Sequence, residues 1–550
     1  MNISNKIIKT LSLLLLSATI SFAQAPPQDW FHLDNSKDNY YGVSDARAYK
    51  ELLKGKKPTK VIVAVIDSGI DTDHEDLKNV IWVNKKEANG VAGKDDDGNG
   101  YIDDVHGWNF IGGKNGNVGP DNLEVTRIYR KLKPKYENAD VSKLSKKEKK
   151  EYALYEKTRD EVKENYDEAS ANVAQMQQTK EMLLNALTAM EKALGKKKPT
   201  QANIDAVDAG DDKNLGIAKR IFSNVFAQGE TVESIGDLKK ELEEQIKGNI
   251  EYYEGQAKYY YNTAFDPRNI VGDNYDDINE KYYGNNEYEG PDALHGTHVG
   301  GIIGAERDNN IGMNGVANDV AIMTVRAVPD GDERDKDVAN AIRYAVDNGA
   351  KVINMSFGKS YSPGKRAVDA AVQYAVKHDV LLVHAAGNSN QDNDDTVNFP
   401  NFPNDHYQKH GFFWFLKPKV AKTWIEVGAL NYKKGEEMVA PFSNYGKNNV
   451  DLFAPGMKIY STLPNNEYKN LQGTSMASPV VAGVAALVRS YYPNLSAQQV
   501  KKILLASSTK VNQQVIKPGT KDKVPFSSLS VSGGIVNAYA ALKMAARMSK

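Results

Sequence analysis

The 550-residue chain contains no cysteine. It can form no disulfide and carry no lipid on an N-terminal cysteine, so a large core or a bound metal must supply its stability. It also lacks an excess of charge, because 70 lysines and arginines stand against 71 aspartates and glutamates, and the basic residues are not segregated. We therefore expect no nucleic-acid partner.

Long apolar runs are also scarce, and one mostly apolar stretch lies at the N-terminus. Residues 11–20 follow a basic start and precede small residues at positions 21–25. This pattern predicts a secretory signal peptide over residues 1–23, with cleavage after Ala23 or Ala25. The alternative, a membrane anchor, would need about 20 apolar residues. We expect a secreted or periplasmic protein that is no lipoprotein and has no stable membrane insertion after cleavage.

Near the C-terminus, the run Gly473-Thr474-Ser475-Met476-Ala477-Ser478-Pro479 places one serine among small residues. The apolar stretch 480–488 that follows predicts a buried helix. A serine hydroxyl is a weak nucleophile unless a base accepts its proton and donors stabilise the resulting oxyanion. The start of a helix offers such donors, because its first N–H groups have no partner within the helix.

A candidate base and a candidate carboxylate lie upstream of this serine. His295 precedes the small and apolar residues 299–305, which predict a helix. The apolar run 61–66 predicts a strand buried on both faces, and Asp67 follows directly at its C-terminal end. Catalytic groups of open α/β sheets gather at those strand ends. The chain order Asp, His, Ser is one of the orders known for serine nucleophiles.

Four runs together resemble the subtilisin-like serine peptidases. They are Val65-Ile66-Asp67-Ser68-Gly69-Ile70-Asp71, His295-Gly296-Thr297-His298-Val299, Ala385-Ala386-Gly387-Asn388 and Gly473-Thr474-Ser475-Met476-Ala477-Ser478-Pro479. The resemblance implies a Ser475 nucleophile, a His295 base and an Asp67 carboxylate that orients the imidazole. It also implies that the side-chain amide of Asn388 donates to the oxyanion.

The residues themselves leave alternatives open. Ser475 could be a helix N-cap, and Asn388 a turn residue. His298 lies about one turn after His295 and would be a packed helix residue or, less simply, half of a zinc pair. Asp71 and Asp73 are carboxylates close to Asp67, but only Asp67 ends the buried strand.

Strands and helices alternate over most of the chain, which predicts an α/β fold with a doubly wound, mostly parallel sheet of subtilisin type. The stretch 389–451 reads as irregular. Ser356, Phe357 and Gly358 follow a predicted strand and, with Ala386 and Gly387, resemble the edges along which an extended substrate binds. Lys359 stands where family members often carry glycine, which leaves the preference of the specificity pocket open.

An acidic loop suggests a calcium site of the EF-hand kind. Its ligand positions one, three, five, seven and nine hold Asp95, Asp97, Asn99, Tyr101 and Asp103. The glutamate expected at position twelve is replaced by His106, and Asp104 is a candidate substitute. The alternative is an acidic, glycine-rich turn without a metal.

A second calcium site follows only from the resemblance. Asp76 and Asn309 match positions that hold a structural calcium in many subtilisins, with the backbone oxygens of Ile311 and Met313 completing the set. The expected cofactor is therefore structural Ca²⁺, and no organic cofactor is expected.

Two runs with apolar residues at three-four spacing, starting near Tyr155 and Ile235, predict amphipathic helices in an antiparallel hairpin. We interpret this region as an inserted helical subdomain that either packs only on itself or docks a partner. The expected organisation is a signal peptide 1–23, a lead-in 24–60, a catalytic domain 61–112 and 268–550, and an insertion 113–267.

These observations predict a secreted serine endopeptidase that hydrolyses protein or peptide substrates through an acyl-enzyme. One alternative is a specialised processing protease. The other is a retired fold of the same kind that serves as a binding or scaffold protein. The complete set of Asp67, His295 and Ser475 favours an enzyme.

Overall fold

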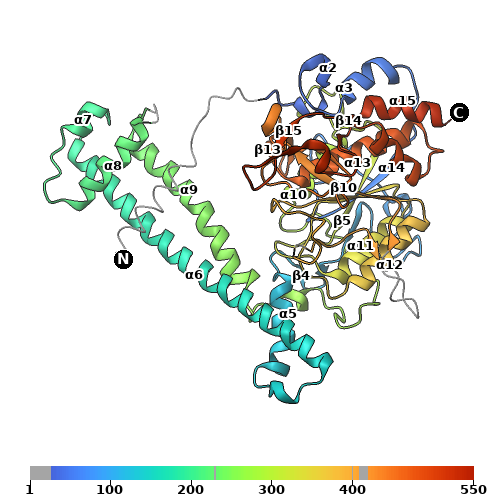
Figure 1. The fold of residues 1–550 in the computed structure, drawn as a ribbon, viewed down its shortest axis with the longest axis horizontal. Helices are drawn as coiled ribbons and strands as arrows, with labels where there is room; N and C mark the ends of the chain where they lie inside the picture. Colours follow the sequence, from blue (N-terminus) through green and yellow to red (C-terminus); the bar gives the residue numbers. More distant parts are fainter. Residues whose placement is uncertain (1–25, 228–230, 399, 408–418, 550) are drawn as a thin grey trace. The chain divides into compact units, whose positions relative to one another are not determined.

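The structure is a computed structural model that describes residues 26–227, 231–398, 400–407 and 419–549. The predicted signal peptide, 1–23, lies outside the described residues. The chain forms two compact units, one of residues Val125–Phe265 and the other of residues Pro26–Glu124 and Asp266–Lys550. Residues 113–124, expected in the insertion, belong to the second unit. Figure 1 shows the elements of both.

A nine-stranded sheet forms the centre of the second unit, in the order β14-β17-β11-β10-β7-β6-β1-β5-β2. The pairs from β17 to β2 are parallel, and β14 is antiparallel to β17. Its strands are β1 (Val61–Asp67), β2 (Gly107–Asn109), β5 (Val320–Arg326), β6 (Val352–Met355), β7 (Leu381–Ala385), β10 (Trp424–Leu430), β11 (Leu452–Pro455), β14 (Thr509–Lys510) and β17 (Gly534–Ile535).

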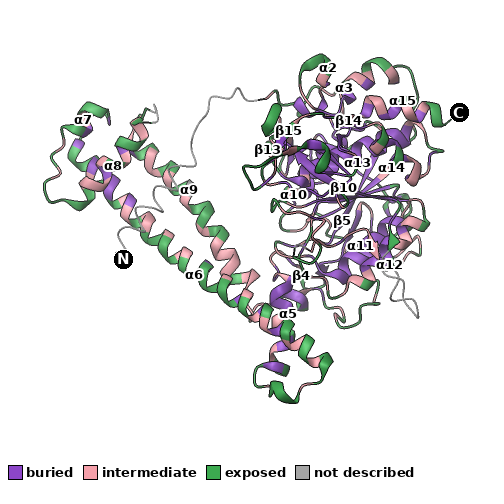
Figure 2. Cartoon of the chain, viewed as in Figure 1, coloured by how far each residue is buried: buried purple, intermediate pink, exposed green. Residues whose placement is uncertain are grey.

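Helices cover both faces of this sheet. Alternate residues of β1 point to opposite sides, so Val63 joins one apolar core and Ala64 joins the other. The first core is completed by α10 (Leu294–Gly304), α13 (Thr474–Tyr491), α14 (Ala497–Ala506) and α15 (Ala538–Met548), and the second by α11 (Asp335–Asp347) and α12 (Lys365–Lys377). Figure 2 shows the buried strands between these helices. The predicted doubly wound α/β fold is confirmed.

One central strand was not predicted. Strand β10 lies between β7 and β11 and is buried throughout, although the stretch 389–451 reads as irregular. Glu426 interrupts its apolar run, and this carboxylate is buried. The carboxylate is satisfied by partners from other segments, which sequence periodicity does not show.

The lead-in before β1 is part of the core of the second unit. Trp30 and Phe31 are fully buried, and the Trp30 indole N–H donates to the carbonyl of Met457. The lead-in contains α2 (Asn35–Asp38), α3 (Asp45–Ala48) and a π-helical turn (Tyr49–Leu53). Residues 45–53 are therefore divided between an α-helix and a π-helical turn.

The remaining elements of the second unit are short. They are α4 (Lys85–Ala88), β3 (Gly112–Gly113), β4 (Gly116–Asn117), β8 (His406–Tyr407), β9 (Lys419–Val420), β12 (Ile459–Leu463), β13 (Glu467–Leu471), β15 (Gln514–Ile516) and β16 (Lys523–Pro525). The last eight form four antiparallel pairs. In the part of the chain described, no helix is long and apolar enough to cross a membrane.

The first unit is helical. Its helices are α5 (Glu124–Tyr136, whose first residue lies in the other unit), α6 (Lys146–Leu194), α7 (Gln201–Asp205), α8 (Lys213–Ala227) and α9 (Ile235–Gly255). Ser145 and Glu148 form a capping box at the start of α6. Both α8 and α9 pack on α6, around a core that includes Leu187, Met190 and Phe222. Docking of a partner by this unit stays a prediction.

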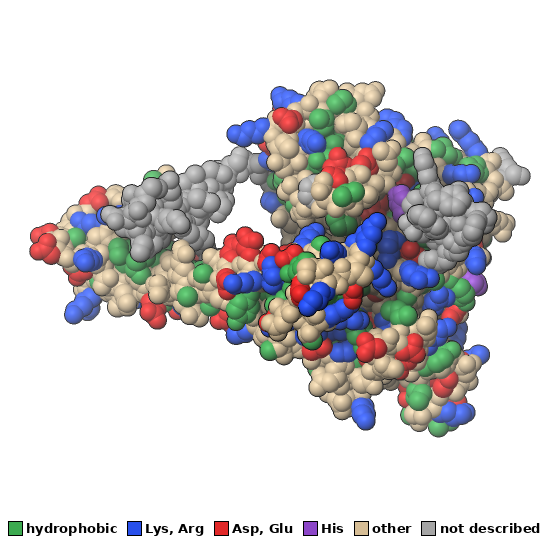
Figure 3. All heavy atoms as spheres, turned by 60° about the horizontal axis from the view of Figure 1, so that its bottom comes forward, with side chains coloured by type: hydrophobic (Ala, Val, Ile, Leu, Met, Phe, Trp, Pro, Cys, Tyr) green, Lys and Arg blue, Asp and Glu red, His purple; other side chains and the backbone are tan. Residues whose placement is uncertain are grey.

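Charges of both signs are distributed over the surface. On the face shown in Figure 3, acidic and basic side chains both occur across the described residues. The second unit also buries several ion pairs, such as Arg268 with Asp337 and Lys336 with Asp273. These pairs place charge inside the unit, where it is compensated locally.

Candidate active site

Asp67 and His295 form a hydrogen-bonded pair. Asp67 is the last residue of β1, and His295 lies in the first turn of α10. His295 Nδ1 lies 2.7 Å from Asp67 Oδ1, and the backbone N–H of Ser68 also donates to that oxygen. Asp67 is only 2% exposed. Burial alone would lower the pKa of His295, but attraction to the Asp67 carboxylate outweighs burial and raises that pKa.

Ser475 is brought to the same edge of the sheet. It is the second residue of α13, and its Oγ donates to the backbone carbonyl of Ser356 over 3.2 Å. Ser356 follows the end of β6, whose Met355 pairs with Ile66, the residue before Asp67. Ser475 is therefore held at the end of β6, the strand that neighbours the one ending in Asp67. No hydrogen bond joins Ser475 to His295 among the described residues, and such bonds often form only with substrate present.

Asn388 is oriented by the turn before Ser475. Its Oδ1 accepts from both the backbone N–H and the hydroxyl of Thr474, at 2.8 and 2.9 Å. The side-chain Nδ2 of Asn388 is thereby left to donate elsewhere. A Cβ built on Gly473 would lie 3.5 Å from Asn388 Nδ2 and 3.5 Å from the backbone nitrogen of Ser475. Both predicted oxyanion donors therefore border one small space, which the glycine leaves empty.

Gly473→Ala is expected to lower kcat/KM by about 10²–10³, because the methyl group would occupy this space and keep an oxyanion from its donors. The new Cβ makes no contact shorter than 3.5 Å, although the φ of +152° disfavours a side chain. Thermal denaturation should therefore show a folded variant, and Gly435→Ala, at an open loop glycine, is the control. An unchanged kcat/KM in folded Gly473→Ala would contradict this location of the oxyanion site.

The predicted substrate edges lie on both sides of Ser475. The Ser356 hydroxyl donates to the carbonyl of Ser475, and the backbone N–H of Gly387 donates to the hydroxyl of Thr474. Ala386 is buried behind Gly387. The segments 356–358 and 386–388 are thus both hydrogen-bonded to the first residues of α13.

Lys359 does not present a free charge at this edge. Its ammonium is 1% exposed and pairs with Glu124 at 2.8 Å and Asp335 at 3.1 Å. It also donates to the backbone carbonyl of Glu333. Burial raises the pKa of the Glu333 side chain to about 8, against the opposing attraction of Lys359. The lysine that replaces the usual glycine therefore belongs to a buried ionic cluster.

The alternative catalytic and zinc residues have other roles. Burial lowers the pKa of His298 to about 4, and its Nε2 contacts the carbonyl of Lys469. Asp71 accepts from the backbone N–H groups of Asp73 and Asn465, and Asp73 is exposed. His298 is thus a packed core residue, and Asp67 is the carboxylate that meets His295.

Comparison with known proteins gives the same result as the geometry. The family model described as "Subtilase family" matches residues 58–521, which is most of the chain. The chain belongs to the subtilase family. It is a subtilisin-like serine peptidase, in which Asp67, His295 and Ser475 occur in the order expected for that family.

Individual relatives match only part of this subtilase. Subtilisin DY of Bacillus licheniformis is 37% identical over 217 residues, which are 39% of this chain and 70% of that protein. A thermophilic serine proteinase of Bacillus sp. strain AK1 is 39% identical over 207 residues, 37% of this chain and 45% of that protein. A solved structure of a cold adapted subtilisin-like serine proteinase has 30% identity and a TM-score of 0.33, covering 43% of this chain and 74% of that one.

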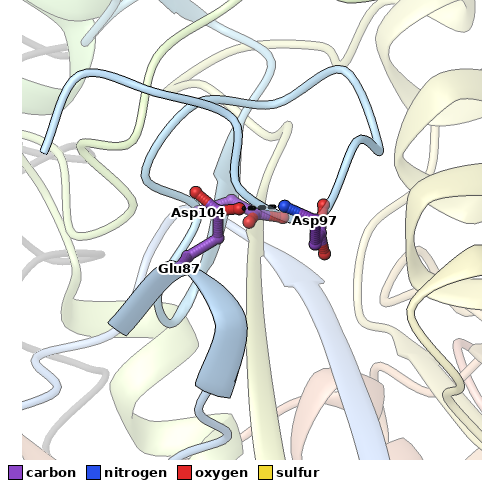
Figure 4. A group of neighbouring side chains, drawn as sticks. All are labelled: Glu87, Asp97 and Asp104. Atoms are coloured by element: carbon purple, nitrogen blue, oxygen red, sulfur yellow. Dashed lines mark hydrogen bonds between the residues drawn. The ribbon is translucent and has the colours of Figure 1, made fainter. Parts of the chain in front are cut away.

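The acidic loop of this subtilase brings together only some of its predicted calcium ligands. Asp97 and Asp104 approach Glu87 of α4, and one oxygen of each lies within 4.8 Å of the others (Figure 4). Sequence reasoning missed Glu87, because it lies outside the loop. The dashed line in the figure is the bond from the Asp97 N–H to Glu87, which also accepts from the N–H of Asp96.

The other loop residues are turned elsewhere. The Asp95 carboxylate accepts from the backbone N–H groups of Gly98 and Gly100, and Asp103 accepts from that of Gly93. Asn99 donates to Asp104, and the ring of Tyr101 packs among aromatic side chains. Burial raises the pKa of Asp104 to about 6, although Tyr344, Asn99 and Asn84 donate to it.

The second predicted calcium site is satisfied by protein donors. Asp76 is fully buried and accepts from the Asn309 amide at 2.6 Å and from the backbone N–H of Met313 at 3.0 Å. Asn309 in turn accepts from the N–H of Ile311. The structure thus brings Asp76, Asn309 and Met313 together. Binding of Ca²⁺ by these residues and the backbone oxygens of Ile311 and Met313 stays a prediction.

Proposed function

We propose that this subtilase is a secreted endopeptidase that hydrolyses protein substrates through an acyl-enzyme on Ser475. The observation that supports this most is the 2.7 Å bond between Asp67 and His295 at the strand edge that also holds Ser475. This bond keeps the proton of the neutral imidazole on Nδ1, which leaves Nε2 free to act as a base.

The reaction then follows from these side chains. Ser475 Oγ attacks the substrate carbonyl carbon and passes its proton to His295, while Asn388 Nδ2 and the Ser475 N–H stabilise the oxyanion. The imidazolium gives the proton to the leaving amine as the peptide C–N bond breaks. Water then repeats the sequence on the acyl-enzyme and releases the acid. The Asp67 carboxylate stabilises each imidazolium without taking its proton.

An extended substrate would lie along the segment 356–358. Main-chain hydrogen bonds to an added strand depend little on substrate sequence, which suits proteins as substrates. Secretion is supported by the signal-peptide pattern at residues 1–23. Catalysis is tested by incubating casein with the purified chain and with Ser475→Ala. We expect fragments only from the wild type, and equal stability of casein in both would leave a binding or scaffold role.

We also propose a structural cation, with Ca²⁺ held by Glu87, Asp97 and Asp104. These three carboxylates lie together without a lysine or arginine partner among the described residues, and oxygen is the ligand that Ca²⁺ prefers. A cation there would offset their mutual repulsion. The proposed site thereby omits Asp95, Asn99 and Asp103 as side-chain ligands, keeps Asp97 and the substitute Asp104, and adds Glu87.

Calcium is expected to stabilise the wild type by about 2.7 kcal/mol when its free concentration is 100 times Kd. Thermal denaturation with Ca²⁺ and with a chelator measures this effect. Asp97→Asn should abolish the response, whereas Asp95→Asn, in the same loop but outside the cluster, should retain it. A response that Asp97→Asn leaves intact would contradict the assignment.

A further inference from the structure

A buried histidine contacts the predicted substrate-binding segment 356–358. His384, on β7, is fully buried. Its Nδ1 lies 3.0 Å from both carboxylate oxygens of Glu426 on β10, and its Nε2 lies 2.8 Å from the backbone carbonyl of Phe357. The pairing of Met355 with His384 and of His384 with Glu426 shows that this contact crosses three neighbouring strands.

Both ring nitrogens of His384 therefore face groups that only accept hydrogen bonds. A neutral imidazole carries one N–H and would direct a lone pair at either the carboxylate or the carbonyl. The imidazolium carries two and satisfies both contacts. Burial alone would lower the pKa of His384, but Glu426 and the Phe357 carbonyl outweigh burial and raise it. The geometry of these two contacts therefore favours the imidazolium form of His384.

Further donors surround the Glu426 carboxylate. Its oxygens also accept from the Trp424 indole at 2.8 Å and from the Asn401 amide at 3.4 Å. Asp451 accepts from the backbone N–H of Glu426 and is itself paired with Lys501. Other titratable groups near the pair, among the described residues, are Glu333, and Asp405 and His406, which line a pocket together with Glu426.

The contact from Nε2 reaches the substrate edge itself. Phe357 lies between Ser356, whose carbonyl accepts from Ser475, and Gly358. A Cβ built on Gly358 would lie 2.8 Å from Asn401 Oδ1 and 3.8 Å from His384 Nε2. The histidine thus contacts the segment 356–358 directly.

We propose that the ion pair of His384 and Glu426 positions the substrate-binding segment 356–358 by holding the carbonyl of Phe357. This inference rests on the proposed peptidase function and adds a positioning residue to it. When His384 loses its proton at alkaline pH, one of its two contacts becomes repulsive and the segment is released. Substrate binding then weakens, while the chemistry at Ser475 and His295 continues.

The test is the pH dependence of kcat and KM in the full chain and in Glu426→Gln, which keeps the shape of the side chain and removes its charge. We expect KM to rise about tenfold, the size of one lost charge-assisted hydrogen bond. The alkaline limb of kcat/KM should move to lower pH, and the acid limb should stay in place. The rate of labelling by a small fluorophosphonate should change less than threefold.

The controls separate this role from general damage. His378→Gln, at the exposed histidine that follows α12, should leave both limbs unchanged. The proposal would be overturned if Glu426→Gln left both KM and the alkaline limb of kcat/KM unchanged. It would also be overturned if this variant lost fluorophosphonate labelling and peptide turnover to the same extent. Nitrogen-15 NMR of histidine-labelled wild type is independent of any variant, and a neutral His384 ring at pH 7 would also overturn it. A wild type that fluorophosphonate does not label would instead disprove the peptidase function.

Discussion

Replacing Ser475 with alanine is expected to lower kcat for peptide hydrolysis by about 10⁶, the size of loss seen in subtilisin. Ser475 Oγ is the atom that forms the acyl bond, and alanine has no group to replace it. His295→Ala should cost about as much, and the double variant should be no slower than either single one, because the two residues act as a unit. Turnover of a fluorogenic peptide measures all three variants.

The controls for this series come from the same elements. Ser490→Ala removes a buried hydroxyl of α13 that donates to the carbonyl of Leu487, and it should keep activity within a few-fold of wild type. A loss in Ser475→Ala no larger than in Ser490→Ala would show that another group performs the attack.

Asp67→Asn is expected to lower kcat by about 10⁴. The asparagine amide would donate to His295 Nδ1, so the imidazole would keep its proton on Nε2 and could not accept one from Ser475. Activity requires neutral His295, which forms above its pKa, and Asp67 raises that pKa. Loss of the carboxylate should therefore move the acid limb of kcat/KM to lower pH, as a pH–rate profile would show.

Asp71→Asn provides the matched carboxylate control. Asp71 lies four residues from Asp67 but accepts only backbone N–H groups among its described bonds. We expect the acid limb of kcat/KM in Asp71→Asn to coincide with that of the wild type. An acid limb that stays in place in Asp67→Asn would mean that Asp67 does not set the protonation of His295.

The catalytic residues could be predicted from sequence because each lies in a short run with a distinctive local pattern. Asp67 ends an uninterrupted apolar strand, and Ser475 begins an apolar helix, so both the element and the position of the side chain follow from neighbours in sequence. The helices of the inserted unit were predictable for the same reason, since the three-four spacing of their apolar residues is local.

Long-range polar contacts could not be predicted in this way. Glu426 and His384 are 42 positions apart, and neither has a neighbour that signals a buried ion pair. Glu426 also interrupts the apolar run of β10, so the sequence of this strand reads as irregular. Glu87 lies in α4, outside the acidic loop, and contacts the loop through the backbone N–H of Asp97. Lys359 pairs with Glu124, which is distant in sequence. Such partners become apparent only when the strands are assembled.

Labelling of the folded chain with a fluorophosphonate, with the adduct mapped by mass spectrometry, tests the proposed Ser475 nucleophile most directly. We expect a single adduct, on Ser475. It should form rapidly in the wild type and far more slowly in Asp67→Asn, because the nucleophile depends on a correctly oriented His295. An adduct on another residue, or none on folded wild-type protein, would contradict the proposed nucleophile.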